Sequence, residues 1–209
     1  MNYDSVPLRD FKELNDWETV IFVYQSALKQ VETKIDILNG EFQHRHKYNP
    51  IEHVKSRIKT PESIVKKLKR HGYESSIENM VRYVNDIAGI RISCSFTSDI
   101  YLIADMISKQ NDLTILARRD YMKNPKKSGY RSYHMLVTTP VFLSDSIIDT
   151  KVEIQIRTVA QDFWATLEHK MHYKFEGDGP DYITKELREC ARYLSLIHIS
   201  EPTRLDVIS

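Results

Sequence analysis

Apolar residues recur at steps of three and four along the first part of the chain. The series comprises Trp17, Ile21, Tyr24, Leu28, Val31, Ile35 and Leu38. An α-helix turns once about every 3.6 residues, so this spacing gathers the series on one helical face. We therefore predict a long helix over residues 13–39 that packs on a core, with a coiled-coil partner surface as the alternative. The pattern breaks in a polar stretch that contains Asn49-Pro50.

Alternation with a period of two predicts strands in "GIRISCSF", "RSYHMLVTTP" and "TKVEIQIRT". A further short strand is predicted in "LTILAR". The apolar positions of the first and third segments are Ile90, Ile92, Cys94, Phe96, Val152, Ile154 and Ile156. The polar positions are Arg91, Ser93, Ser95, Tyr130, Ser132, His134, Glu153, Gln155 and Arg157. One such polar face is ordinarily solvated, but three faces of these residue types favour a ligand site. The second strand is expected to end at Pro140.

Shorter helices are predicted between and after the strands. Thr60 is a candidate N-cap, Pro61 sits at a first helical position and Gly72 suits the exit of that helix. Residues 75–84 and 98–109 also have helical spacing.

Thr158 is predicted to cap a helix that carries Phe163, Leu167 and Met171 along one side, and a last helix spans 181–195. The expected fold class is α/β (α+β), a mixed sheet flanked by helices. We interpret residues 1–195 as one domain with a core at 50–175. Residues 196–209, with Pro202 where a helix would continue, look foreign to the rest, and a native irregular tail is the alternative.

Composition narrows the class of protein. The chain has 209 residues, 41% of them hydrophobic and 28% charged, with a net charge of +1. These values are typical of a globular protein with no general attraction to nucleic acid or membranes. The N-terminus has no signal-peptide pattern and no apolar run could span a bilayer, so a cytoplasmic location is the expectation. Two cysteines without a CxxC pair disfavour a disulfide scaffold or a zinc ribbon.

Two carboxylates stand in unusual surroundings. Asp86 is expected to close a helix just before a strand, and Glu153 lies within an apolar strand. A buried acid costs stability unless it is paired or bound to a metal. If the two strands are close, both acids could share one Mg²⁺, while a salt bridge to arginine is the alternative for each acid alone.

Two basic clusters supply positive charge near these acids. The clusters are Lys55, Arg57, Lys59, Lys66, Lys67, Lys69 and Arg70, and then Arg118, Arg119, Lys123, Lys126, Lys127 and Arg131. Runs of charge are usually solvated surfaces, yet two of them beside two carboxylates indicate a polyphosphate site. The sequence contains no GxxxxGK[ST], GxGxxG or HExxH, which argues against P-loop enzymes, dinucleotide folds and zincin proteases. His169 and His172 are interpreted as structural.

Four motifs, "DIAGIRISCSF", "RDYMKNPKKSGYRSYHM", "VEIQIRT" and "DFWATLEHKMHYK", resemble the synthetase domain of RelA/SpoT-type enzymes in order and spacing. The chain is similar to a small alarmone synthetase of the RelP-like branch over residues 13–195. No His-Asp dipeptide occurs, which implies synthesis without the hydrolysis of bifunctional relatives. The resemblance implies a nucleotidyltransferase-like fold and transfer of pyrophosphate from ATP to the 3′-hydroxyl of GDP or GTP.

The resemblance also implies roles for individual residues. Asp86 and Glu153 would hold Mg²⁺, with Glu153 as the general base. The residues expected to bind ATP are Arg57, Lys59, Arg70, Arg91 and Arg119, and those expected at the acceptor are Lys126, Tyr130, His134, Gln155 and Glu168, with Tyr130 stacked on guanine. Nucleic acid is not required as a partner. Family members form homotetramers through helices at both ends, which the unusual tail puts in question here.

Two alternatives stay open from the sequence. A toxin-type relative would modify tRNA or adenine nucleotides, and the basic clusters could serve an RNA. A catalytically silent nucleotide- or RNA-binding module is the other, against which the presence of both Asp86 and Glu153 argues.

Overall fold

A computed structural model of the protein describes residues 16–46, 48–175 and 180–197. Its centre is a mixed five-stranded sheet in the order β1-β2-β5-β4-β3. The β2–β5 pair is parallel, and the β1–β2, β4–β5 and β3–β4 pairs are antiparallel. The strands are β1 (Ile51–Ile58), β2 (Ala88–Cys94), β3 (Thr114–Asp120), β4 (Tyr133–Phe142) and β5 (Ile147–Thr158). The predicted α+β class with a mixed sheet is therefore confirmed.

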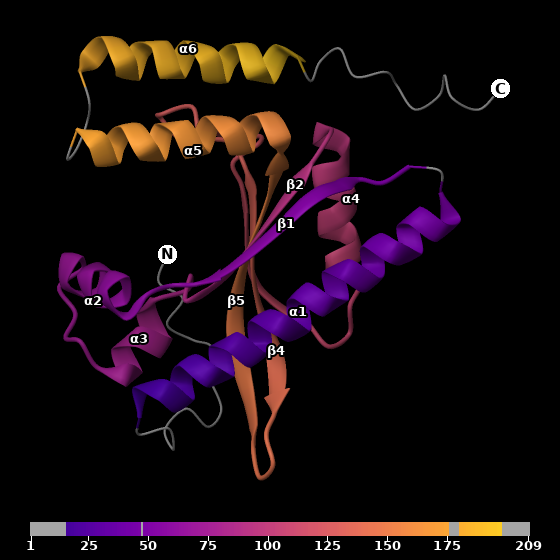
Figure 1. The fold of residues 1–209 in the computed structure, drawn as a ribbon, viewed down its shortest axis with the longest axis vertical. Coiled ribbons are helices and arrows are strands. Elements are labelled where there is room, and N and C mark those ends of the chain that lie inside the picture. The colour runs from indigo at the N-terminus through magenta and orange to yellow at the C-terminus, as the bar shows by residue number, and fades with distance from the viewer. Residues whose placement is uncertain (1–15, 47, 176–179, 198–209) are drawn as a thin grey trace.

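Six helices of the described chain surround the sheet (Figure 1). They are α1 (Trp17–Arg45), α2 (Pro61–Arg70), α3 (Ile77–Tyr83), α4 (Thr97–Ser108), α5 (Val159–Lys174) and α6 (Asp181–Ile197). Helix α1 crosses the sheet diagonally, α2 and α3 lie near one end of β1, and α5 and α6 run alongside one another (Figure 1).

Helix α1 buries the apolar stripe that its sequence predicts. Tyr24, Val31 and Ile35 are at most 2% exposed and join the core under the sheet. The helix continues to Arg45, beyond the predicted end at residue 39, because Phe42 prolongs the stripe by one more turn and is itself buried. The polar residues that follow the stripe in sequence are compatible with a helix, so they did not mark its end.

Several predicted helix caps are present. The Thr60 side chain accepts a hydrogen bond from the Ser63 N–H at the start of α2, where Pro61 is the first residue. Gly72 follows α2 with φ of 78°. Thr158 and Gln161 form a reciprocal capping pair at α5, each side chain accepting from the other's backbone N–H.

Strand β1 is absent from the sequence prediction. Its sequence, "IEHVKSRI", has one buried residue, Ile51, and no apolar alternation. It is an edge strand, and edge strands carry charged side chains that obscure the pattern of a strand. Asn49-Pro50, interpreted as the break between helices, instead leads into this strand.

Two predicted strand ends are also wrong. Strand β4 continues through Pro140 to Phe142. Pro140 pairs with β5 only, because the β3 ladder starts at Thr138, so one edge of the strand tolerates a residue without an N–H. Strand β2 ends at Cys94, and Phe96, predicted on its apolar face, is 37% exposed next to α4.

Helix α5 does not bury the side on which Phe163 and Leu167 lie. Phe163 and Leu167 are exposed, whereas Trp164 and Ala165 pack against α6. Helix α6 is described to Ile197, and the rest of the unusual tail lies outside the described residues. In the described ranges, no helix has the length and apolar character that crossing a membrane requires.

Candidate active site

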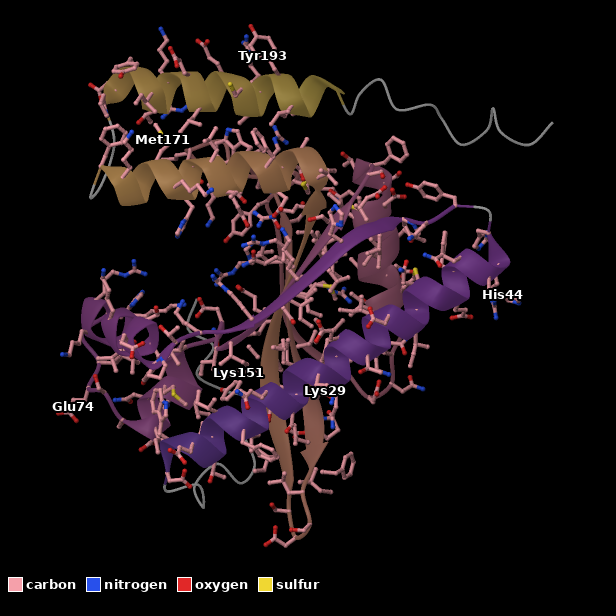
Figure 2. The ribbon with its side chains drawn as sticks, viewed as in Figure 1. Lys29, His44, Glu74, Lys151, Met171 and Tyr193 are labelled. Atoms are coloured by element: carbon pink, nitrogen blue, oxygen red, sulfur yellow. The ribbon has the colours of Figure 1, made fainter. Side chains whose placement is uncertain are left out.

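The strand register brings the polar side chains onto one face of the sheet. Arg91 on β2 pairs with Gln155 on β5, which pairs with His134 on β4, which pairs with Arg119 on β3. Residues paired in register point to the same side. Glu153 shares this side with Gln155, two residues away. The predicted joining of the polar faces is therefore confirmed, and nitrogen-rich side chains gather between α2 and α5 (Figure 2).

The Glu153 carboxylate lies at the centre of this face. Its Oε2 accepts a hydrogen bond of 2.8 Å from Gln155 Nε2, and its Oε1 is 3.6 Å from His134 Nδ1. Burial raises the pKa of Glu153, but the His134 ring and the Gln155 amide outweigh it and hold the pKa below its ordinary value. The carboxylate is therefore ionised and ready to bind a cation or accept a proton.

Asp86 faces two lysines rather than an arginine. It lies in the turn between α3 and β2, not at the end of a helix as predicted. Lys59 Nζ is 2.9 Å from one carboxylate oxygen and Lys67 Nζ is 2.7 Å from the other. Burial raises the pKa of Asp86, and the two lysines more than reverse this effect, so the pKa lies below its ordinary value.

The two carboxylates are close enough for the charge of Asp86 to raise the pKa of Glu153. Among the described residues, no group of three or more His, Cys, Asp or Glu side chains could hold a metal ion. Mg²⁺ characteristically uses one or two protein carboxylates and takes its other ligands from water and substrate phosphates. Asp86 and Glu153 match that number of protein carboxylates.

A buried ion cluster lies at the far end of β2 and β5. Arg157 is 2% exposed, and its guanidinium is 2.8 Å from Asp162 Oδ1. Arg91 approaches the same oxygen at 3.5 Å, so Asp162 bridges the two arginines. The sequence prediction missed Asp162, although an acid in the first turn of the helix after "QIRT" was a usable signal.

Tyr130 and His134 form an aromatic corner beside Glu153. The Tyr130 hydroxyl is 2.9 Å from His134 Nε2, so one ring nitrogen of His134 meets Tyr130 and the other faces Glu153. Lys126 Nζ lies 4.7 Å from the centroid of the Tyr130 ring and 5.0 Å from that of Tyr121. Burial is the main reason that the pKa of Tyr130 is raised.

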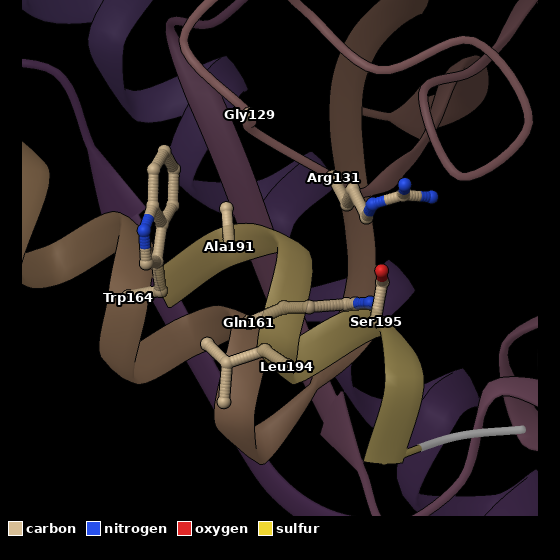
Figure 3. A pocket seen from close by; sticks show the side chains of 7 residues that line it. All are labelled: Gly129, Arg131, Gln161, Trp164, Ala191, Leu194 and Ser195. Atoms are coloured by element: carbon tan, nitrogen blue, oxygen red, sulfur yellow. The ribbon is translucent and has the colours of Figure 1, made fainter. Parts of the chain in front are cut away.

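Gly129 is packed closely against α6. Its φ is 99°, and a Cβ added there would lie 2.7 Å from the Ala191 Cβ on α6. Trp164 on α5 lines the same small pocket (Figure 3). Its indole N–H donates a hydrogen bond of 2.7 Å to the Leu187 carbonyl. Helices α5 and α6 thus hold the loop that carries Tyr130.

The remaining predicted residues lie at the edges of this surface. Arg57 pairs through Gly89 with Glu153, and the glycine leaves no side chain between them. Arg70 at the end of α2 is exposed and Glu168 on α5 is half-buried. Within the described ranges, neither forms a hydrogen bond or ion pair with Asp86 or Glu153.

Ser132 was expected to share the polar face with Tyr130 and His134. It is instead fully buried, and its hydroxyl donates to the Ile156 carbonyl at 3.1 Å. The expectation that it offers a free polar group is therefore wrong, because the strand pairing consumes its hydroxyl.

Comparison with known proteins identifies the family of this chain. Residues 56–178 match the model of the region found in RelA/SpoT proteins. GTP pyrophosphokinase YwaC of Bacillus subtilis is 47% identical over 178 residues, covering 85% of this chain and 85% of that protein.

Two solved structures from the same organism have the same fold. Small alarmone synthetase 2 superposes with a TM-score of 0.79 at 44% identity, covering 88% of this chain and 97% of that one. Small alarmone synthetase 1 bound to its product pppGpp gives 0.81 at 33% identity, covering 88% and 93%. The resemblance inferred from the four motifs is confirmed. Since the family match spans more than half of the chain, and YwaC is matched over most of its length, the chain belongs to the RelA/SpoT family and to its small alarmone synthetases.

Proposed function

We propose that this protein transfers pyrophosphate from ATP to the 3′-hydroxyl of GDP or GTP, producing the alarmones ppGpp and pppGpp and releasing AMP. The names of its relatives, a GTP pyrophosphokinase and a synthetase bound to pppGpp, support this activity. The observation that carries the proposal is the ionised Glu153 carboxylate, which lies between the lysine-bound Asp86 and the Tyr130–His134 corner.

In the proposed reaction the 3′-oxygen of the acceptor attacks the β-phosphorus of ATP. A new O–Pβ bond forms, the bond from Pβ to the oxygen bridging Pα breaks, and AMP leaves with the electron pair. Glu153 takes the hydroxyl proton as general base. Its lowered pKa means that the carboxylate is free of a proton throughout the neutral range. Transfer of this kind depends mainly on alignment and on neutralising phosphate charge.

The donor side supplies that neutralisation. Lys59 and Lys67 lie next to Asp86 and would turn part of their charge to the ATP phosphates. Arg91 is held beside Asp162 at the same sheet face. The other residues assigned to ATP are Arg57 and Arg70 on this side, and Arg119 on β3 at the opposite edge of the sheet.

The acceptor side offers a ring and a cation. Tyr130 would stack on guanine, while Lys126, already near that ring, would contact acceptor phosphates. Gln155 and His134 flank Glu153 and would orient the ribose toward it. Glu168 is assigned to the edge of the same pocket.

Asp86 and Glu153 would hold Mg²⁺ with the ATP phosphates completing its ligands. Bound there, the ion supplies charge neutralisation at the transferred group. The two carboxylates with lowered pKa values support this assignment, since both are ionised at neutral pH.

The direct test separates the nucleotide products of the protein incubated with labelled ATP, Mg²⁺ and GDP, GTP or tRNA. We expect ppGpp and pppGpp with stoichiometric AMP, and no label on tRNA. Labelled tRNA would instead identify a toxin-type relative, and absence of every product would identify a silent binding module.

Lys69→Gln, on the exposed side of α2, is the matched control for variants of Lys67.

We further propose that the protein acts in the cytoplasm as a homotetramer. Large apolar side chains remain exposed on α5 and α6, among them Phe163 at 69%, Tyr182 at 64% and Tyr193 at 57%. Exposed apolar residues that recur along two adjacent helices support burial against further copies. Size-exclusion chromatography with light scattering gives the mass of the assembly, and a monomeric mass would contradict this proposal.

A further inference from the structure

Lys151 is a buried lysine with no part in the proposed reaction. It lies on β5 (Figure 2), two residues before Glu153, and is 5% exposed. Its ammonium donates to two uncharged acceptors, the Arg82 carbonyl at 3.1 Å and Asn85 Oδ1 at 2.7 Å. Burial lowers its pKa to about 8, so the side chain keeps its proton at neutral pH. Lysine is rarely buried without a carboxylate partner, so this costly arrangement requires an explanation.

Both acceptors belong to the segment that leads into Asp86. Arg82 is in the last turn of α3, where backbone carbonyls lack partners within the helix and favour a cation. Asn85 immediately precedes Asp86 in the turn between α3 and β2. A single ammonium therefore ties the end of α3 and the turn to β5.

The same turn is also held by Lys59, which directly follows β1. The Lys59 N–H donates to the Ile87 carbonyl at 2.8 Å, and the Lys59 ammonium reaches Asp86. The Asn85–Asp86 turn thus lies between Lys59 and Lys67, which hold Asp86, and Lys151 of β5, which holds Asn85. Since β5 also carries Glu153, Lys151 links the positions of the two carboxylates.

We propose that Lys151 is a positioning residue, which fixes the Asn85–Asp86 turn so that the Asp86 carboxylate meets the donor triphosphate and its divalent cation. This inference rests on the proposed function of the same site. Lys151 itself is 5% exposed, and its ammonium is bonded within the protein. Its contribution therefore reaches the reaction through the place of Asp86 relative to Glu153.

The test is the affinity for α,β-methylene-ATP, an analogue in which the bond to be broken is replaced. Calorimetry gives its dissociation constant in Mg²⁺ and in EDTA, and the ratio of the two measures how much the metal strengthens binding. We expect Lys151→Met to reduce this ratio by about 10- to 100-fold, as for other residues that orient a metal ligand, and to leave affinity in EDTA unchanged. Lys34→Met, which removes a partly buried lysine on α1 that pairs with Asp112, is the control.

A second variant covers the chance that Lys151→Met does not fold. Asn85→Ala removes one of the two acceptors and keeps the lysine, and Lys151→Arg keeps a cation at this position. We expect Asn85→Ala to lower the ratio, Lys151→Arg to restore most of it, and the double variant Lys151→Met/Asn85→Ala to be no weaker than the worse single variant. A folded Lys151→Met or Asn85→Ala protein with the wild-type ratio would overturn the inference. Failure of the wild type to make alarmone would overturn the proposed function instead, since the binding ratio does not depend on turnover.

Discussion

The two halves of the site are built by different physical means. The donor half consists of ion pairs, in which Asp86 is held by Lys59 and Lys67 from neighbouring segments of the chain. The acceptor half consists of packed rings and a glycine, in which Tyr130 meets His134 and Gly129 fits against α6. Glu153 lies where they meet. Charge should therefore control nucleotide binding in the donor half, and the shape of the packed rings should control it in the acceptor half.

The largest expected effect on turnover comes from changing Glu153, where the two halves meet. Glu153→Gln keeps the size of the side chain and removes the base, so kcat should fall by about 10²–10⁴-fold. Both nucleotides should still bind in the absence of Mg²⁺, because the cations and the rings are untouched. Initial rates and calorimetric affinities measure the two quantities separately. Wild-type turnover in this variant would contradict the role of Glu153 in either half.

A variant of the donor half should affect ATP alone. Lys67→Gln removes a charged hydrogen-bonding group, and the affinity for the ATP analogue should fall by about 10- to 100-fold. Affinity for GDP should be unchanged. Lys69→Gln on the same helix should behave as wild type. Equal losses for both nucleotides would show that the two halves are not separate.

A variant of the acceptor half should affect the guanine nucleotide alone. Tyr130→Ala should weaken GDP binding by about 1–3 kcal/mol through loss of stacking. Tyr130→Phe keeps the ring and loses only the hydroxyl contact with His134. A hydrogen bond of this kind contributes about 0.5–1.5 kcal/mol to the free energy of unfolding. Unchanged GDP affinity in Tyr130→Ala would rule out stacking on this ring.

The smallest effect concerns stability and its dependence on pH. The pKa of Asp86 is below its unfolded value near 3.8, so the folded state favours the ionised form. This stabilisation is complete above the unfolded pKa and is lost as the pH falls through the folded pKa. Asp86→Asn should therefore lower the free energy of unfolding by about 1 kcal/mol at neutral pH and by nothing at strongly acidic pH. Urea denaturation at several pH values measures the difference, and an equal loss at every pH would exclude the ion pairs as its cause.

Alternation in the sequence was sufficient to predict the central strands. Glu153 and Gln155 share the polar face because Val152, Ile154 and Ile156 are fully buried on the other. A strand covered on one face by helices must follow this period. The polar surface of the sheet could thus be predicted before its neighbours in space were known.

Other parts of the site depend on contacts that no local pattern encodes. In "KKLKR" the helical period separates buried Leu68 from its neighbours but does not show that Lys67 reaches Asp86. Strand β1 carries charge at an edge, so it has no alternation to detect. The ionic bridge of Asp162 to two arginines joins three elements and exists only in the folded chain.

The fit of Ala191 against Gly129 has an evolutionary consequence. The α6 surface leaves no space there for a side chain on Gly129, so the size of residue 191 sets how closely the loop can approach. A lineage could therefore adjust its output of alarmone by exchanging one small residue for a slightly larger one on an outer helix. Such a change would leave every residue that contacts a nucleotide intact. Inherited differences in enzyme activity can therefore arise outside the nucleotide-contacting residues.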